Sequence, residues 1–300
     1  MKTTFLTIKL CLFISFFTFS QINSLKVLTI NVWSGLDYRG TFKFGEYESD
    51  EIREKRFEVL LKQIKMLQPD VIFLQEANPV GKYSAKLADE LGYDEIHQVC
   101  NGGIKFGPLG LPSNFKEGMA ILVRKDLLLE EHHTSKLTGC FGIYGDMLTI
   151  HFDESRFLIA GKIKVSDTPI YLINAHLGSE PPFDSAGVQK RNAEVEQILI
   201  YVEELKDHPV ILGGDFNAAP GSDEIKKIIN SKVLFGSYFN DSPDKNYTWD
   251  PIKNSNIRYS TNYFDARGET LTEFEIKSAD YDTVPRKIDY IFLNNKFSLI

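Results

Sequence analysis

The sequence predicts a layered α/β sandwich in which helices cover the outside of packed sheets. Apolar runs of strand length alternate with amphipathic runs of helical length along most of the chain. No internal repeat, low-complexity tract or Pro/Ser-rich linker divides residues 21–300, which favours one domain. The 300 residues are 43% hydrophobic and 25% charged, so the composition is globular and the length is sufficient for such a domain.

The first half of the chain predicts a strand, a helix and a second strand. Residues Lys26–Val32 are rich in β-branched side chains and form the first strand. From Glu51 to Leu67, apolar residues recur at helical spacing among charged ones, and Pro69 ends that helix. The apolar run Val71–Leu74 then predicts a buried strand that ends in Gln75 and Glu76.

The second half continues the alternation. Short apolar runs predict strands at residues 119–123, 157–160, 170–173, 210–212 and 288–292, and a long amphipathic helix runs from about Val188 to Leu205. The Gly- and Pro-rich stretch Asn101–Lys116 cannot form a regular helix, and we expect an apolar loop there. This loop either folds onto the core or reaches a membrane surface.

Polar side chains recur where these strands end or begin. They are Asn31, Glu76, Asn174, His176, Asp215, Asn217 and Asp289. Burying one such group without a partner costs about 1–3 kcal/mol, so a chain that repeats this cost gathers the groups around a ligand. Carboxylates suit Mg²⁺ or Mn²⁺ and can accept a proton from water, whereas imidazole can donate a hydrogen bond to an anion.

Several common enzyme motifs are absent from the 300 residues. There is no GxSxG, no GxxxxGK and no GxGxxG, so serine-dependent acyl transfer, P-loop phosphoryl transfer and Rossmann-type cofactor binding have no support. The string Gly213–Pro220 is the most specific one present. Its two glycines permit a sharp turn in which the backbone can approach its neighbours closely, and such a turn presents Asp215 and Asn217 on one side. The alternative is a plain turn after a strand, because Asp and Asn are ordinary turn residues.

Six short motifs occur in a fixed order from residue 29 to residue 292. They are Thr29–Trp33, Leu74–Ala77, Asn174–Leu177, Gly213–Ala218, Thr248–Asp250 and Lys287–Phe292. Together they resemble the endonuclease/exonuclease/phosphatase superfamily, which includes deoxyribonuclease I, abasic-site endonucleases, inositol polyphosphate 5-phosphatases and neutral sphingomyelinases. The resemblance implies a four-layer α/β sandwich of two packed mixed sheets with outer helices.

The resemblance also implies a phosphoric ester hydrolase in which a divalent metal, Mg²⁺ or Mn²⁺, assists the attack of water on phosphorus. It places Glu76 at the metal, with Asn31 close to the metal and the phosphate. It makes Asp215 the group that orients or deprotonates water, with Asn217 helping to position it, and it brings His176 to the scissile phosphate. Such chemistry needs no covalent intermediate.

Asp289 completes the catalytic residues that the resemblance implies. In the family, a Ser-Asp-His motif follows the strand that carries this aspartate, and its histidine contacts the phosphate. No Ser-Asp-His occurs after Asp289 in this sequence. We therefore expect the family domain, which begins after the first 20 residues, to continue beyond Ile300; the alternative is an inactive, non-catalytic binding protein on the same fold.

The N-terminus predicts export. Lys2 and Lys9 precede an apolar run at residues 10–19 that is too short to span a bilayer, and the small residues before Gln21 suit cleavage after Ser20. Residues 1–20 are thus expected to be a signal peptide of a secreted or periplasmic protein, the alternative being a retained membrane anchor. Cleavage would remove Cys11 and leave Cys100 and Cys140, which either form one disulfide or stay as free thiols.

The charge and one further motif bear on the substrate. A formal charge of −7 disfavours long nucleic acid as a partner, although a bound metal can supply local positive charge. The string Thr248–Asp250, followed by Asn254-Ser255, is similar to a stretch in bacterial sphingomyelinases. We therefore expect a phosphodiester substrate that is a phospholipid headgroup, with contact to a membrane surface and a monomeric protein; an extracellular nuclease is the alternative.

Overall fold

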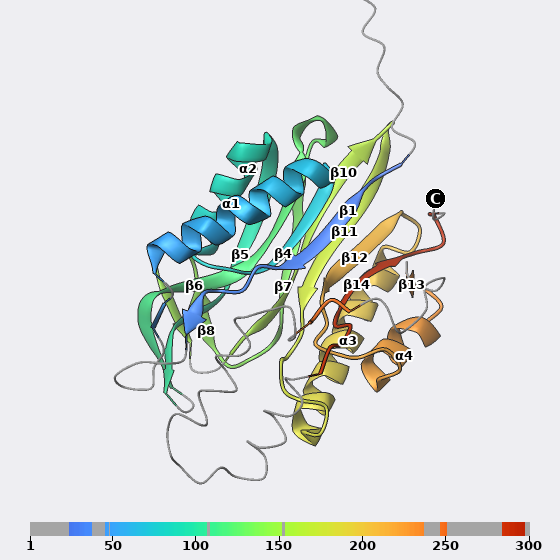
Figure 1. The fold of residues 1–300 in the computed structure, drawn as a ribbon. Coiled ribbons are helices and arrows are strands. Elements are labelled where there is room, and N and C mark those ends of the chain that lie inside the picture. The colour runs from blue at the N-terminus through green and yellow to red at the C-terminus, as the bar shows by residue number, and fades with distance from the viewer. Residues whose placement is uncertain are drawn as a thin grey trace, which may run out of the picture.

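Two mixed sheets pack face to face, and helices cover their outer faces (Figure 1). This computed structural model describes residues 24–37, 46–47, 49–106, 109–151, 154–236, 247–250 and 284–297. The arrangement confirms the predicted four-layer α/β sandwich. The predicted signal peptide at residues 1–20 lies outside the described residues, as do Asn254 and Ser255.

The first sheet has the strand order β1-β4-β6-β5. Its strands are β1 (Val27–Asn31), β4 (Val71–Ala77), β5 (Tyr93–Phe106) and β6 (Leu109–Arg124). Strands β1 and β4 run parallel, so their carboxyl ends meet at one edge, whereas β6 pairs antiparallel with both β4 and β5. Helices α1 (Asp50–Leu67) and α2 (Val80–Leu91) cover the outer face of this sheet.

The second sheet has the order β13-β14-β12-β11-β10-β7. Its strands are β7 (Glu130–Thr138), β10 (Arg156–Val165), β11 (Thr168–His176), β12 (Val210–Asp215), β13 (Phe235–Gly236) and β14 (Asp289–Leu293). Strands β11 and β12 run parallel and β14 runs antiparallel to β12. The carboxyl ends of β11 and β12 therefore meet the amino end of β14.

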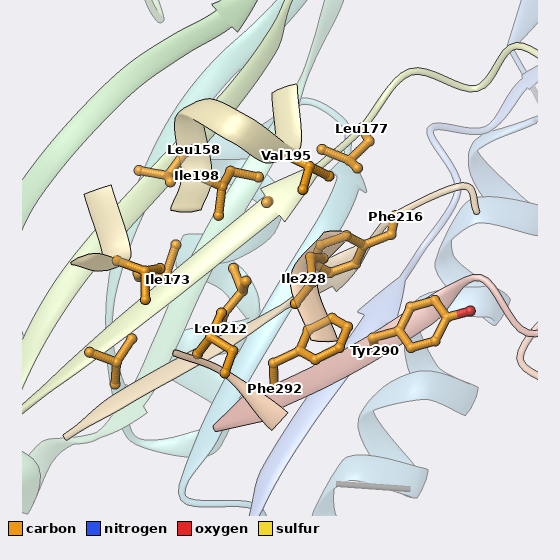
Figure 2. Packing of buried hydrophobic residues seen from close by; sticks show 14 of the residues in the cluster. Leu158, Ile173, Leu177, Val195, Ile198, Leu212, Phe216, Ile228, Tyr290 and Phe292 are labelled. Carbon is orange, nitrogen blue, oxygen red and sulfur yellow. The ribbon is translucent and has the colours of Figure 1, made fainter. Parts of the chain in front are cut away.

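Strand alternation divides the core into three apolar layers. In β4, Val71 and Phe73 point into the layer between the sheets, and Ile72 and Leu74 point towards α1 and α2. On the far side of the second sheet, α3 (Ser185–Glu204) and α4 (Asp223–Asn230) pack on the third layer. Figure 2 shows that layer, where Phe216 lies edge-on to the rings of Tyr290 and Phe292.

Most of the predicted elements are confirmed, but two local expectations are wrong. The described residues of Asn101–Lys116, which are 101–106 and 109–116, belong to strands β5 and β6 rather than to an irregular loop, because register pairs such as Ile104 with Leu111 satisfy the backbone of both strands. Gly213 and Gly214 lie within β12, so the chain turns only after Asp215. The sequence does not predict helices α2 and α4, nor several of the strands, among them β5, β7 and β13.

Two further expectations concern cysteines and membranes. Cys100 is buried and Cys140 is exposed, and both are free thiols, so the disulfide alternative is wrong in this structure. Burial raises the pKa of the Cys100 thiol beyond the ordinary range, which keeps it protonated. None of the described helices is long and apolar enough to cross a membrane.

A small hairpin is held against the outer sheet edge by an ionic contact. It consists of β8 (Gly142–Tyr144) and β9 (Thr149–His151), and β9 packs against β5 and β6. The imidazole of His97 on β5 lies between two carboxylates, with Nδ1 3.1 Å from Glu95 Oε2 and Nε2 3.2 Å from Asp146 Oδ2 in the hairpin turn. Hydrogen bonding to Glu95, aided by both negative charges, raises the pKa of His97 to about 9.

The raised pKa of His97 predicts a pH-dependent stability. The protonated ring contributes stability that is fully present below pH 6.5 and is lost as the pH rises through about 9. Because His97 and Asp146 are partly exposed, we expect a loss of only about 1 kcal/mol across this window. Urea unfolding at pH 6.5 and pH 9.5 measures it, and Asp146→Asn should reduce the difference; an equal pH dependence in that variant contradicts the assignment.

Candidate active site

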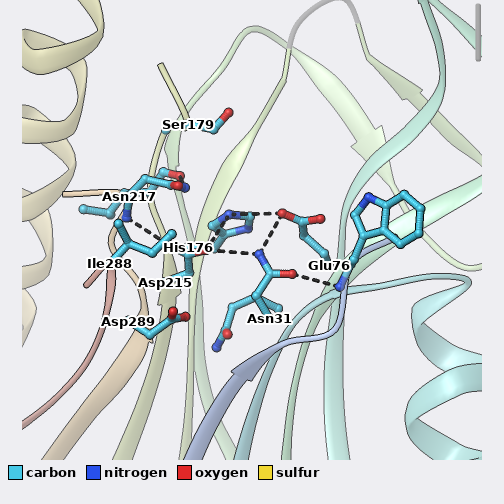
Figure 3. A network of polar contacts seen from close by, with 12 residues as sticks. Asn31, Glu76, His176, Ser179, Asp215, Asn217, Ile288 and Asp289 are labelled. Carbon is cyan, nitrogen blue, oxygen red and sulfur yellow. Dashed lines mark hydrogen bonds and ion pairs between the residues drawn. The ribbon is translucent and has the colours of Figure 1, made fainter. Parts of the chain in front are cut away.

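The polar side chains predicted at strand ends converge at one end of the layer between the two sheets (Figure 3). Strand alternation explains the convergence. Val27 of β1, Ile211 of β12 and Ile291 of β14 all face the layer between the sheets. Residues an even number of positions along each strand face the same way, which directs Asn31, Asp215 and Asp289 into the open end of that layer.

Asn31 bridges the two halves of this site. Its Nδ2 donates to Glu76 Oε1 at 2.8 Å and to Asp215 Oδ2 at 3.0 Å, so one amide from the first sheet contacts a carboxylate on each sheet. Its Oδ1 accepts a hydrogen bond from the backbone N–H of Trp33 at 2.9 Å, which fixes the orientation of the amide. The side chain predicted beside the metal thus lies between two carboxylates.

Glu76 enters the site through a break in strand register. Plain alternation after Ile72 and Leu74 would point Glu76 towards the helices. Instead, the pairing of β4 with β6 is interrupted between Leu74 and Ala77, and Glu76 has a φ of 55°. A bulge of this kind re-aims a side chain at the cost of local backbone strain, and here it turns the carboxylate towards Asn31.

Asp215 lies at the end of β12, which approaches its neighbours closely. A Cβ on Gly213 would come within 2.4 Å of the Phe73 ring, and one on Gly214, whose φ is 147°, would come within 1.9 Å of the Ala175 carbonyl oxygen. Both positions therefore require glycine. The backbone N–H of Asn217 donates to Asp215 Oδ1 at 2.9 Å, which holds the two predicted residues together.

Asp289 is the register partner of Asp215 across β12 and β14. Its backbone N–H donates to the hydroxyl of Thr248 at 3.1 Å, which brings the Thr-Trp-Asp motif to the site. Burial and the charge of Glu76 raise the pKa of Asp289 to about 6, and burial together with the charge of Asp289 raises the pKa of Asp215 well above its usual range. Asp289 Oδ1 is shielded from solvent and has no hydrogen-bond donor among the residues that the structure describes.

His176 lies at the end of β11 beside a buried arginine that sequence reasoning missed. Its Nε2 is 3.9 Å from Glu76 Oε1 and 4.0 Å from Asp215 Oδ2, and Arg156 Nη1 is 3.3 Å from its Nδ1. Burial and the charge of Arg156 lower the pKa of His176 well below its ordinary value, so the imidazole is neutral. Arg156 Nη1 is also 3.4 Å from Nε2, and because an arginine can only donate, the ring nitrogen that accepts from it is the one without a proton.

A second residue missed by sequence reasoning is Glu117 of β6. It is buried, and Asn101 lies opposite it on β5. Burial and the charge of Glu76 raise its pKa to about 8, while Arg156 opposes this increase. A carboxylate two residues before the apolar run at 119–123 follows the same strand-boundary pattern that identified Glu76, and this signal could have found it.

The segment after His176 is held by helix α3. Arg191 is buried, donates to the carbonyls of Gly178 and Glu180, and is itself held by Glu224 Oε1 at 2.8 Å. Glu194 accepts from the Gly178 N–H at 3.0 Å and from the Thr138 hydroxyl. These contacts fix the backbone that follows His176.

The same segment also contacts the buried arginine. Arg156 Nη2 donates to the hydroxyl of Ser179 at 3.3 Å and to Glu154 Oε2 at 3.2 Å. The Leu177 carbonyl accepts from Asn217 Nδ2 at 3.0 Å. The fixed segment therefore supports both the arginine beside His176 and the asparagine beside Asp215.

The donor set of the site fits a divalent cation. The negative charge of Glu76 contributes to the raised pKa of Glu117, of Asp215 and of Asp289, and Arg156 opposes the increase at Glu117. Within the described part of the chain, no group donates a hydrogen bond to the shielded Oδ1 of Asp289, which leaves this oxygen available to a cation. Hard oxygen donors of this kind suit Mg²⁺ or Mn²⁺. No group of three His, Cys, Asp or Glu side chains is already assembled as a metal cluster in the described part of the chain.

Fold and site together define a protein of the class that acts on phosphoric esters. The sequence profile of the Endonuclease/Exonuclease/phosphatase family matches residues 28–300, and the chain belongs to this family. The mannosyl-6-phosphatase of Bacteroides thetaiotaomicron has a similar fold, with a TM-score of 0.56 and 19% identity over 91% of this chain and 86% of that one. These values establish a shared fold.

Other relatives extend the comparison. The catalytic domain of human Nocturnin with bound sulfate superposes with a TM-score of 0.55 and 17% identity, covering 90% of this chain and 83% of that one. In sequence, a protein named Phospholipase C from Staphylococcus aureus is 28% identical over 128 residues, which are 40% of this chain and 36% of that relative. The match thus spans little more than a third of the relative's length.

The role of Glu194 in holding the segment after His176 predicts the effects of two substitutions. Glu194→Ala leaves the buried Gly178 N–H without an acceptor, and we expect the free energy of unfolding to fall by about 2–3 kcal/mol. Glu194→Gln keeps an acceptor for that N–H and should cost less than half as much. Urea denaturation of both variants measures this, and a Glu194→Ala protein as stable as the wild type contradicts the assignment.

Proposed function

We propose that the chain is an exported phosphodiester hydrolase that depends on a divalent metal and cleaves phospholipid headgroups by attack of water on phosphorus. The observation that carries this proposal is the convergence of Glu76, Asp215 and His176 from two sheets around one amide, Asn31. Export rests on residues 1–20, and a monomeric state is part of the same proposal.

Glu76 would hold the cation, Mg²⁺ or Mn²⁺, with Asn31 beside it. When bound, the ion would supply positive charge to the phosphate oxygens on which negative charge develops. Asn31 already contacts both Glu76 and Asp215, so it keeps the carboxylate of the metal site in a fixed relation to the carboxylate that acts on water. The bulge at Glu76 sets the direction of its carboxylate.

Asp215 is the group that would orient the attacking water and accept its proton. The backbone N–H of Asn217 holds one carboxylate oxygen and Asn31 holds the other, so the carboxylate cannot rotate freely. Burial and Asp289 raise the pKa of Asp215, which makes it a better proton acceptor than a solvated aspartate. Asp289 thereby supports the base without contacting the water itself.

His176 and Arg156 would bind the phosphate. The neutral His176 ring directs Nε2 towards Glu76 and Asp215, and in the tautomer with a proton on Nε2 it would donate to a phosphate oxygen. The adjacent Arg156 guanidinium supplies a fixed positive charge, and it is held in place by Glu154 and Ser179. Donors fixed in advance at the position of developing charge lower the barrier without reorganisation.

Three observations favour a phospholipid headgroup over nucleic acid. The Thr248–Asp250 motif that resembles bacterial sphingomyelinases lies at the site, through the hydroxyl of Thr248. The sequence relative with 28% identity is named Phospholipase C. The acidic charge of −7 disfavours long polyanions. An extracellular nuclease and a non-catalytic binding protein are the alternatives, and zebrafish TDP2 with a single-strand DNA product shares the fold.

The proposal predicts a substrate preference that depends on metal. With Mg²⁺ we expect the full-length protein to release phosphorylated headgroup from sphingomyelin vesicles, and EDTA should abolish this release. Plasmid DNA in the same buffer should be cut far more slowly or not at all. Turnover of DNA alone contradicts the lipid preference, and turnover of neither substrate with added Mg²⁺ or Mn²⁺ favours the non-catalytic alternative.

Asp215→Asn separates catalysis from folding. The substitution removes the proton acceptor, so we expect the rate to fall by about 10²–10⁴-fold. It relieves repulsion with Asp289 but leaves either Asn31 Nδ2 or the Asn217 N–H without its acceptor, so the two effects oppose each other and the protein should stay folded with only a small change in melting temperature. The matched control is Glu203→Gln, an exposed carboxylate on α3, which should leave both quantities unchanged. An Asp215→Asn protein with wild-type activity refutes the assigned role.

A further inference from the structure

The hairpin β8–β9 presents an apolar face to solvent. Phe141 is 78% exposed and Met147 is 97% exposed, and Ile143 and Leu148 are each 49% exposed. Ile150, the register partner of Ile143, is partly exposed beside them. Neighbouring exposed apolar side chains on an ordered element are unusual on a soluble protein and mark an interaction surface.

The opposite face of the hairpin is built into the protein. Thr149 and His151 are buried, and His151 Nε2 accepts from the Gly102 N–H at 2.8 Å. Tyr144 packs edge-on against Phe157. Because one face is fixed by these contacts, strand alternation directs Ile143 and Ile150 outward. Phe141 directly precedes β8, and Met147 and Leu148 lie in the turn between the two strands.

The turn of the hairpin is fixed as well. Asp146 is bound by His97, the Gly145 N–H donates to the Leu148 carbonyl at 3.1 Å, and the Thr149 hydroxyl donates to the Gly145 carbonyl at 2.8 Å. Met147 therefore stands at the tip of a turn closed by hydrogen bonds. Its exposure is a property of an ordered segment.

The charges on the hairpin identify the kind of partner that would fit. Asp146 is the only acidic or basic residue from Phe141 to Ile150, and His97 neutralises it. No side chain from Phe141 to Ile150 is a cation that could attract an anionic lipid or a nucleic acid, and the Lys136 ammonium beside them is bound to the Gly139 and Cys140 carbonyls. The chain charge of −7 repels both kinds of polyanion. The complementary surface is electrically neutral outside and apolar beneath, as in a bilayer of zwitterionic phospholipid.

The hairpin is joined to the candidate active site. The Tyr144 hydroxyl is hydrogen-bonded to the hydroxyl of Ser155, which directly precedes Arg156. The Ser155 N–H donates to Asn101 Oδ1 at 2.9 Å, and Asn101 lies opposite Glu117. The base of the hairpin is therefore hydrogen-bonded to the residue that precedes Arg156, and Arg156 contacts His176. Through Ser155 and Asn101 it is also linked to the strand pair that contains Glu117.

We propose that the outward face of β8–β9, formed by Phe141, Ile143, Met147 and Leu148, docks the protein onto zwitterionic phospholipid surfaces. The inference rests on the proposed function, since it supplies the contact that keeps a headgroup-cleaving site at its substrate. Met147 and Phe141 enter the interfacial region of the bilayer, while Asp146 stays bound to His97.

Vesicle binding tests the surface without hydrolysis. Co-sedimentation of the full-length protein with phosphatidylcholine vesicles in EDTA gives the partition coefficient. The variant Phe141→Ser with Met147→Ser should lower it by about tenfold or more, because two apolar side chains no longer enter the bilayer. The matched control is Met66→Ser with Ile200→Ser, which removes exposed apolar side chains from α1 and α3 and should change partition less than twofold.

The outcomes separate the surface from the proposed activity. Equal partition of the two double variants overturns the docking surface, as does an absence of vesicle binding by the wild type. Self-association that the Phe141/Met147 variant abolishes, without vesicle binding, assigns the face to a second copy and also overturns it. Hydrolysis of soluble bis(4-nitrophenyl) phosphate with Mg²⁺ is measured on the same proteins, and the hairpin variant should hydrolyse it as fast as the wild type. If no protein hydrolyses this substrate while the wild type still binds vesicles, the proposed function is contradicted and the docking surface is not.

Discussion

The candidate site depends on a buried amide contact between the two sheets. Asn174 on β11 donates to the carbonyls of Leu74 and Ala120 on the opposite sheet, both at 2.9 Å, and its Oδ1 accepts from Gln75 Nε2 at 2.7 Å. All these groups are buried, so a relative shift of the sheets would leave several polar atoms unpaired. Since Glu76 follows Gln75 and His176 lies two residues after Asn174, this contact sets the distance between the two halves of the site.

Between the two sheets that Asn174 holds together, the site concentrates negative charge that the fold only partly compensates. The raised pKa values of Asp215, Asp289 and Glu117 have a common cause, burial near other carboxylates, and Arg156 opposes it for Glu117. The strained backbone at Glu76 has the same location. A fold that accommodates both the concentrated negative charge and the strained backbone at one end of its core is suited to a ligand with positive charge. This fits the metal dependence proposed for the site.

Sequence patterns predicted the layers and the site well because apolar runs mark the strands and polar residues mark where five of them begin or end. These boundaries were enough to group Asn31, Glu76, His176, Asp215 and Asp289, although the bulge that turns Glu76 into the site has no signal in the apolar run Val71–Leu74. The pairing of residues 101–116 was not predicted, since Gly and Pro obscure strand periodicity when the partner strand supplies the stabilising contacts. Arg156 was missed because it begins a strand, where an arginine looks solvated, and only the fold buries it beside His176.

The most direct test of this account is the Mg²⁺ affinity of Gln75→Met, measured by titration calorimetry on the full-length protein. The substitution keeps side-chain volume but removes the donor to Asn174, and the exposed Gln63→Met on α1 is its control. The account predicts that Gln75→Met stays folded with a free energy of unfolding lower by about 1–3 kcal/mol and binds Mg²⁺ at least about tenfold more weakly than the wild type and Gln63→Met. A folded Gln75→Met protein that binds Mg²⁺ with wild-type affinity would contradict it.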